Sequence, residues 1–338
     1  MYFLGIETSC DETAAAVFTE VPTVLSSVVA SQNELHARFG GVVPEVAARA
    51  HLRNLLPTID QALRQADVRL EQIGAVAVHH TPGLVGALLV GVSCAKMLAV
   101  ALDVPLLAVN HVKAHLYACR LAAGRDIFPC VGLVVSGGHT CLFHCRSALD
   151  FQLLGATIDD AAGEAFDKVA SILELGFPGG PALERTAATG NPKAHKFPRS
   201  FINEQRLDFS FSGLKTAVLY AVKGKDLSIP HRQLMLQEKA DAAASFQQAV
   251  VDVLVSKAAQ ALAQTGLRRL AVGGGVTANG ALRRGLEAMA KARGAELFIP
   301  PPSLCTDNAA MAAMAVEHWR LGQFAPLDLD ASPSFLSS

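Results

Sequence analysis

The sequence predicts an α/β fold with two related lobes. Short apolar runs typical of strands alternate with longer helical patterns, which is the arrangement of α/β proteins. Two distant segments, Tyr2–Phe18 and Cys130–Cys145, also resemble each other, since each consists of an apolar run, a polar turn and a second run. We therefore expect each lobe to begin with a β-hairpin whose turn faces a shared cleft.

The length and composition agree with two well-packed domains. A chain of 338 residues usually forms about two domains. Only 17% of the residues are charged and 51% are hydrophobic, which favours a buried core and argues against disorder. We expect an N-terminal lobe over residues 1–125, a C-terminal lobe over 126–325 and a loosely ordered tail over 326–338.

The elements follow from hydrophobic periodicity and from cap residues. In the first lobe we expect short strands at 76–78 and 106–109 and helices at 45–66, 83–102 and 111–122. Pro57 predicts a break in the 45–66 helix, and Asn110 is a predicted N-cap. In the second lobe we expect helices at 160–175, 240–264, from about 280, and 307–321, with a strand at 270–272.

The net charge and the cysteines indicate the compartment. The chain has seven cysteines, an odd number, and no CxxC pair. We therefore expect a reducing, cytoplasmic location and no disulfide framework. The N-terminus lacks the pattern of a signal peptide, and the apolar stretch Gly83–Ala95 is too short to cross a bilayer. A net charge of −1 gives no global basic field for nucleic acid.

The clearest chemical signal is the pair His111 and His115. Spacing of four residues places two imidazoles on one face of a helix, where they can share a metal ion or simply lie on the surface. The HExxH metalloproteases have the same spacing, but their general base would stand where this chain has Val112, so that class is rejected. Asp307 is a candidate third ligand, or an ordinary N-cap of the helix that follows it.

Glycine-rich turns and carboxylates indicate a nucleotide. Ser136–Gly138 and Gly273–Gly275 each follow a strand and allow backbone N–H groups to approach an anion, although tight turns require glycine in any case. Asp160, Glu164 and Asp167 share a helix face, either as a solvated surface or with Asp167 on a ribose hydroxyl.

Two stretches are candidate RNA contacts. Lys193–Arg199 interleaves basic residues with an aromatic one, although a solvated loop is the favoured interpretation there. Phe209–Lys215 is the other.

Taken together, these motifs resemble the tRNA N6-adenosine threonylcarbamoyltransferase (TsaD) family, formerly called glycoproteases. The resemblance covers nearly the whole chain in order, and it rests on Gly5–Thr13, Gly40–Glu45, Pro82–Gly86, His111 with His115, Val135–Thr140, Ile158–Lys168, Pro178–Pro181, Phe209–Lys215, Gly274–Asn279 and Cys305–Asn308. It implies an actin-like (ASKHA) fold of two lobes, each with a ribonuclease H-like mixed sheet flanked by helices.

The resemblance also implies an activity and its site. The family is an acyltransferase that moves a threonylcarbamoyl group from threonylcarbamoyl adenylate to N6 of adenosine 37 in tRNAs that read codons beginning with adenine. His111, His115 and Asp307 would bind one iron(II) ion per subunit, with zinc as the alternative. The implied substrate contacts are Val134, Val135, Ser136, Gly137, Gly138, Asp167, Gly180, Glu184 and Asn279.

Catalytic groups and partners complete the expectation. Asp11 or Glu12 could accept the amine proton or orient the acceptor. The expected partners are tRNA, a paralogous subunit (TsaB) and a small ATPase (TsaE), with no membrane. Two alternatives share the fold: an actin-like ATPase or small-molecule kinase, which does not need the three metal ligands, and a non-catalytic scaffold paralog, which could dispense with them.

Overall fold

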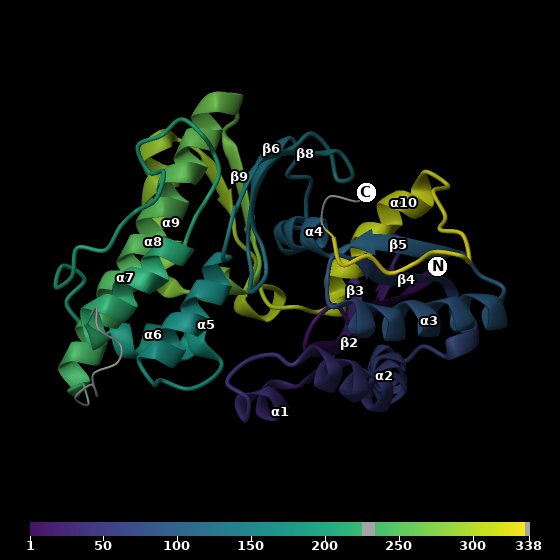
Figure 1. Cartoon of the computed structure of the whole chain (residues 1–338). Helices are drawn as coiled ribbons and strands as arrows, with labels where there is room; N and C mark the ends of the chain where they lie inside the picture. The colour runs from purple at the N-terminus through teal and green to yellow at the C-terminus, as the bar shows by residue number, and fades with distance from the viewer. Residues whose placement is uncertain (225–233, 335–338) are drawn as a thin grey trace. The chain divides into compact units, whose positions relative to one another are not determined.

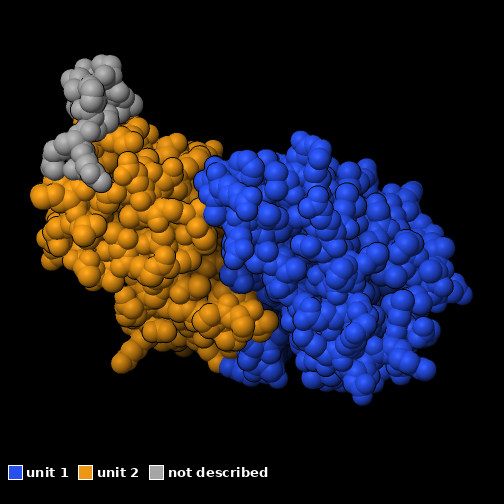
Figure 2. Space-filling model, turned by 90° about the horizontal axis from the view of Figure 1, so that it is seen from below, with its two compact units in different colours: residues 1–126, 306–338 blue, residues 127–305 orange. Residues whose placement is uncertain are grey.

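A computed structural model describes residues 1–224 and 234–334 of the chain (Figure 1). The chain divides into two compact units (Figure 2). Unit 1 contains Met1–Asp126 and the chain from Thr306 onward, and unit 2 is Ile127–Cys305. This differs from the division expected from the sequence, which placed 306–325 in the second lobe. These residues belong to unit 1 because they pack against β1, β2 and β4 of its sheet.

Unit 1 is built on a five-stranded mixed sheet. Its strands are β1 (Tyr2–Glu7), β2 (Glu12–Thr19), β3 (Val24–Ser31), β4 (Ile73–Thr81) and β5 (Leu106–Asn110), in the order β3-β2-β1-β4-β5. The first three pair antiparallel, and β4 and β5 continue the sheet parallel to β1.

Unit 2 repeats this topology. Its strands are β6 (Cys130–Val135), β7 (Thr140–Cys145), β8 (Phe151–Ala156), β9 (Arg269–Gly273) and β10 (Glu296–Phe298). The order β10-β9-β6-β7-β8 has the same antiparallel hairpins and the same parallel additions. The expected pair of lobes, each beginning with a β-hairpin, is confirmed.

Because side chains alternate along a strand, the two faces of the unit 1 sheet contact different layers. Leu4 and Ile6 enter the core that the sheet forms with its covering helices, whereas Gly5 faces the opposite layer. A Cβ on Gly5 would lie 2.9 Å from the Ala309 carbonyl oxygen, so the strand and the segment over it are in close contact. The helices of unit 1 are α1 (Asn33–Ala37), α2 (Pro44–Ala66), η1 (Leu70–Gln72), α3 (Val85–Leu102), α4 (His111–Ala123), η4 (Ala309–Met314) and α10 (Ala315–Arg320).

In unit 2 the long helix α8 (Leu236–Thr265) runs through the main core, and its alanines and valines pack on the sheet and on α5, α6, α7 and α9. The remaining helices are α5 (Ala162–Ile172), α6 (Gly179–Ala187), α7 (Ser212–Lys223), η2 (Gly275–Ala278), α9 (Gly280–Arg293) and η3 (Pro302–Leu304).

Three expectations about elements were wrong. Helix α2 continues through Pro57, because Leu55 and Ile59 on either side of it are buried, while Pro57 and Arg53 are exposed and the unpaired Arg53 carbonyl can be hydrated. The helix expected over 307–321 is a 3-10 segment, η4, followed by the short α10.

The third wrong expectation is that of a loosely ordered tail. Residues 326–334 are tied to the sheet, since Ser332 N donates to the His80 carbonyl at 2.9 Å and Thr81 Oγ1 donates to the Ser334 carbonyl at 3.0 Å. The last part of the expected tail, 335–338, lies outside the described residues.

The apolar stretch expected to be too short to cross a bilayer belongs to a longer helix, because α3 continues to Leu102 and has the length and apolar composition of a membrane span; 39% of it is buried. It packs on β4 and α2.

Candidate active site

Helix α4 brings two histidines together at the end of β5. The Asn110 side chain caps the helix by accepting a hydrogen bond from Lys113 N at 3.1 Å, as predicted. The helix therefore begins at His111, and His115 follows one turn later on the same face. The two ring centroids lie 4.8 Å apart, and both side chains are buried.

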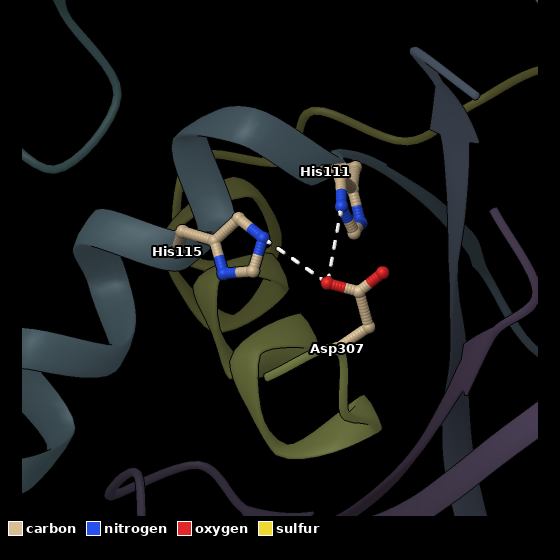
Figure 3. Close-up of side chains that lie close together, drawn as sticks. All are labelled: His111, His115 and Asp307. Atoms are coloured by element: carbon tan, nitrogen blue, oxygen red, sulfur yellow. Dashed lines mark ion pairs between the residues drawn. The ribbon is translucent and has the colours of Figure 1, made fainter. Parts of the chain in front are cut away.

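Asp307 reaches the same point from a distant part of the chain. It lies just after the chain re-enters unit 1, and its Oδ1 is 3.3 Å from His115 Nε2 and 3.6 Å from His111 Nε2 (Figure 3). One ligand atom from each of the three residues lies within 4.8 Å of the other two.

The three side chains fit a divalent metal ion. Two imidazole nitrogens and one carboxylate oxygen are donors that first-row transition metals accept, and they leave coordination positions open. Both ring nitrogens of His115 are buried and make no hydrogen bond of acceptable geometry among the described residues, so an ion at Nε2 would satisfy an otherwise costly group. The structure thus brings together three side chains that could hold a metal ion, the same three that the sequence offers as candidates.

Buried charges determine how these groups titrate. Burial alone would lower the pKa of His111, but the carboxylates of Asp307 and Glu7 outweigh it and raise this pKa to about 9. Burial lowers the pKa of His115. Burial would raise the pKa of Asp307, but the two histidines lower it below its usual range. The carboxylate is therefore ionised at neutral pH, as a metal ligand must be.

A second carboxylate, which was not among the residues predicted from the sequence, lies behind His111. Glu7 is fully buried at the end of β1, and its Oε2 lies 3.0 Å from His111 Nδ1 and 2.7 Å from His79 Nδ1. The available signal was an acidic residue inside an apolar strand. Its partners could not be named without the pairing of β1 with β4.

Asp11 and Glu12 lie in and beside the turn between β1 and β2, within unit 1. Glu12 Oε1 accepts a hydrogen bond from Ser31 Oγ at 3.0 Å. Burial raises the pKa of both carboxyl groups, and the negative charge of Asp307 raises both further, so the pKa of Glu12 reaches about 7. No hydrogen bond or ion pair of the described residues joins either group to the metal triad.

A buried polar network holds this turn. His51 Nε2 lies 2.9 Å from the Cys10 carbonyl, and its Nδ1 lies 2.7 Å from Thr13 Oγ1. Gln32 N donates to the Asp11 carbonyl at 3.1 Å. These contacts fix the backbone on both sides of Asp11 and Glu12.

In unit 2 the predicted turn at Ser136–Gly138 is open. Gly137 and Gly138 are exposed, and a Cβ added to either would meet nothing within 4 Å. Ser136 N donates to the His139 carbonyl at 2.8 Å, and the N-terminus of α5 is attached to the turn through Glu164 N, which donates to the Gly137 carbonyl at 3.0 Å. Val134 and Val135 precede the turn with fully buried side chains, so their contact with a ligand would have to come from the backbone.

The second glycine turn lies against the first. Gly274 has a φ of 98°, and a Cβ there would lie 2.4 Å from the Val135 carbonyl oxygen. Strands β6 and β9 are parallel neighbours, so their carboxyl ends bring both turns to one edge of the sheet. Ligands of α/β proteins commonly bind at such an edge.

The other predicted substrate residues lie at the N-termini of helices α6 and α9 or hydrogen-bond to them. Asp167 Oδ1 accepts from Gly179 N at 2.8 Å, which fixes the start of α6 beside Gly180. Glu184 Oε1 accepts from Gly280 N at 2.7 Å, and Asn279 caps α9 by accepting from Leu282 N at 3.0 Å. The predicted substrate residues of unit 2 therefore form one connected neighbourhood.

Other candidates have structural partners. Lys168 binds both Asp160 and Glu164 at 2.8 Å, so each of these carboxylates has an ion-pair partner within the protein. In Lys193–Arg199, Phe197 is buried and Arg199 binds Asp252 at 2.8 Å, which favours the loop interpretation. Phe209 and Phe211 are core residues and cannot stack on RNA bases.

Comparison with known proteins identifies the family. The family model of tRNA N6-adenosine threonylcarbamoyltransferase (TsaD) matches residues 23–314. A protein of that name from Rhodopirellula baltica is 55% identical, over 98% of this chain and 96% of its own length. Another from Symbiobacterium thermophilum is 54% identical, over 98% of this chain and 95% of its own length.

Solved structures of low sequence identity show the fold. Full-length HypF, in a phosphate- and nucleotide-bound form, superposes with a TM-score of 0.62 at 14% identity over 96% of this chain and 56% of its own. Component A of the Acidaminococcus fermentans (R)-2-hydroxyglutaryl-CoA dehydratase gives 0.54 at 16% identity, over 93% and 96% of the two chains. The expected actin-like α/β fold is confirmed. Both relatives carry the name of a transferase, and the chain belongs to the tRNA N6-adenosine threonylcarbamoyltransferase family.

Proposed function

We propose that this chain transfers the threonylcarbamoyl group of threonylcarbamoyl adenylate to N6 of adenosine 37 in tRNA, with one iron(II) ion held by His111, His115 and Asp307. The observation that supports it most is the convergence of these three side chains, which a nucleotide-hydrolysing relative of the same fold would not need. Zinc is the alternative ion, because the same three donors suit both metals.

The donor carries its own activation. In a mixed anhydride the carbamoyl carbon is bonded to a phosphate oxygen, and AMP is a good leaving group. The N6 amine attacks that carbon, the bond from carbon to the phosphate oxygen breaks, and AMP leaves with the bonding electrons while the amine loses a proton. A bound metal would supply Lewis-acid polarisation of the threonylcarbamoyl moiety.

Unit 2 offers a place for the adenylate. Ser136 N is already used within the turn, whereas the backbone hydrogen bonds of the described residues do not use the N–H groups of Gly137 and Gly138. These amides can hold phosphate charge, and they lie at the start of α5, where the helix dipole also favours an anion. Gly180, at the start of α6, is equally open. We assign Asp167, Glu184 and Asn279 to the ribose and base, directly or by fixing α6 and α9.

Asp11 and Glu12 are the candidates for the amine proton. Glu12 is the better of the two, because its pKa of about 7 allows it to accept a proton near neutral pH and to release it again.

We further propose that the protein works in the cytoplasm with partner proteins. A net charge of −1 supports tRNA binding that depends on a second subunit, for which a paralogous actin-like chain (TsaB) and a small ATPase (TsaE) are the candidates. Unit 1 has an apolar surface on α2 and α3 that a protein partner could cover, where Leu52 is 70% exposed and Val100 is 62% exposed.

Reconstitution tests the reaction. The purified chain would be mixed with threonylcarbamoyl adenylate, tRNA and the two partner proteins, and the tRNA nucleosides would be analysed for the modified adenosine. We expect modification by the unchanged chain and loss of both bound metal and transfer in Asp307→Ala. An Asp307→Ala protein that keeps its metal content and its transfer rate would remove the metal assignment, and an inactive wild-type mixture would remove the reaction.

A further inference from the structure

Glu7 occupies a position where burying an ionised carboxylate costs free energy. It ends β1 and has no exposed surface, and an ionised group without water needs full compensation by hydrogen bonds. Because side chains alternate along a strand, Glu7 lies on the same sheet face as Gly5, the face that η4 covers. Strand β4 runs parallel to β1 with Ile6 beside Val78, so His79 is the neighbour of Glu7 on that face.

The carboxylate accepts hydrogen bonds from three sides. Oε2 lies 2.7 Å from His79 Nδ1 and 3.0 Å from His111 Nδ1, and Oε1 accepts from the backbone N–H of Ser9. The hydroxyl of Ser9 lies 3.1 Å from His111 Nδ1 as well. A carboxylate can only accept, so both imidazoles must carry their hydrogen on Nδ1.

This arrangement fixes the chemistry of His111. With the hydrogen on Nδ1, the lone pair of a neutral ring is on Nε2, the nitrogen that faces Asp307 at 3.6 Å. A hydrogen bond from the far nitrogen of a ligating histidine to a carboxylate sets the tautomer and the ring orientation and makes the ring a stronger donor.

We propose that Glu7 is a positioning residue that holds His111 with Nε2 toward the metal, and that His79 holds Glu7. The proposal rests on the metal site proposed above. Glu7 is not itself a ligand, because it contacts the side of the His111 ring opposite to the nitrogen that faces Asp307. It cannot touch substrate either, because it has no exposed surface.

Metal affinity of Glu7→Gln tests the proposal. The amide keeps the size of the side chain, but one of its two polar atoms donates, so it cannot accept from all three partners. We expect cobalt(II) and zinc, titrated against a chelator, to bind about 10- to 100-fold more weakly, with a shifted ligand-field spectrum of bound cobalt(II).

The matched control is Glu317→Gln. Glu317 Oε1 accepts from Tyr117 at 2.9 Å and from Arg120 at 2.6 Å, so it holds α4 farther along the helix than His111 without touching a metal ligand. We expect this variant to keep the metal affinity and the cobalt spectrum of the unchanged protein. Equal loss in both variants would mean that α4 has only been loosened, and an unchanged Glu7→Gln would contradict the role of Glu7. Either result would overturn the proposal.

A measurement on the unchanged sequence covers the case in which Glu7→Gln fails to fold. In zinc-loaded protein with ¹⁵N-labelled histidine, the His111 signal, assigned by its loss in His111→Asn, should show a protonated Nδ1 and a metal-bound Nε2. Zinc on Nδ1 would overturn the inference while leaving the metal site intact. Absence of zinc binding would instead contradict the proposed function.

Discussion

The two carboxyl groups of the first hairpin sit in surroundings that change their acidity. Glu12 is largely removed from water, and burial is the main cause of its raised pKa. The negative charges of Asp11 and Asp307 add to the effect, and the hydroxyl of Ser31 opposes it. A carboxyl group with a pKa near 7 is half ionised near neutral pH, and a general base works best when its pKa lies close to the working pH.

The transfer rate should therefore depend on pH in a defined direction. The base must be ionised, so the single-turnover rate should rise about tenfold per pH unit below about pH 7 and level off above it. Glu12→Gln should be slow and should lack this rise. The measurement is transfer of labelled threonylcarbamoyl at several pH values with saturating adenylate. If Glu12→Gln shows the same pH profile as the unchanged protein, the base is a different group.

At the scale of elements, close backbone contacts shape the edge of unit 2 where the adenylate is proposed to bind. Helix α5 approaches the Ser136–Gly138 turn so closely that a Cβ on Gly163 would lie 2.5 Å from the Ser136 carbonyl oxygen. The close approach, in addition to any turn geometry, explains a glycine at this point of the helix.

Gly163→Ala should thus displace the turn. Overpacking of this kind typically costs about 1–3 kcal/mol, and we expect weaker adenylate binding with a lower free energy of unfolding. Both can be measured by calorimetry and by denaturant titration. The control is Gly213→Ala in the first turn of α7, where a Cβ meets nothing within 4 Å and alanine should leave stability unchanged or raise it slightly. Equal behaviour of the two variants would refute the argument.

Elements with strong local signals were predicted well. The hairpins, α3, the Asn110-capped α4 and the start of α9 follow from apolar periodicity and cap residues, which act over a few positions. Strand β10 is short, and β8 has only one buried residue, so neither gave a clear pattern. Helix α2 passes Pro57 because tertiary packing outweighs a local penalty, which a local rule cannot weigh.

The same distinction holds for the site. The spacing of His111 and His115 is visible in the sequence because one helix turn brings them together. Asp307 could be proposed only as a candidate, because its contact depends on how distant segments fold. The contact of Glu7 with His79 depends on the register of β1 and β4 and was missed for that reason.

At the scale of the molecule, the groups proposed for the reaction are distributed between the two units. The metal triad, Glu7, Asp11 and Glu12 all belong to unit 1, and the predicted adenylate contacts all belong to unit 2. Both units have the same sheet order, so two copies of one topology carry different functional groups at the ends of their strands.

Metal binding should consequently stabilise the units unequally. An ion at about 100 times its dissociation constant stabilises the folded form by about 2.7 kcal/mol. We expect slower hydrogen exchange in α4, in η4 and around the β1–β2 turn on adding zinc, with little change in α8. Exchange followed by mass spectrometry measures this, with Asp307→Ala as the control that should not respond. A uniform response over both units would contradict it.

The order of the proposed metal ligands along the chain has a consequence for biosynthesis. Two of them precede unit 2 and the third, at position 307 of 338, follows it. During translation the ribosome must therefore make all of unit 2 before the proposed set of three ligands is complete. Chains that stop before Asp307 would lack the third proposed ligand, so full metal loading would distinguish them from chains that contain it.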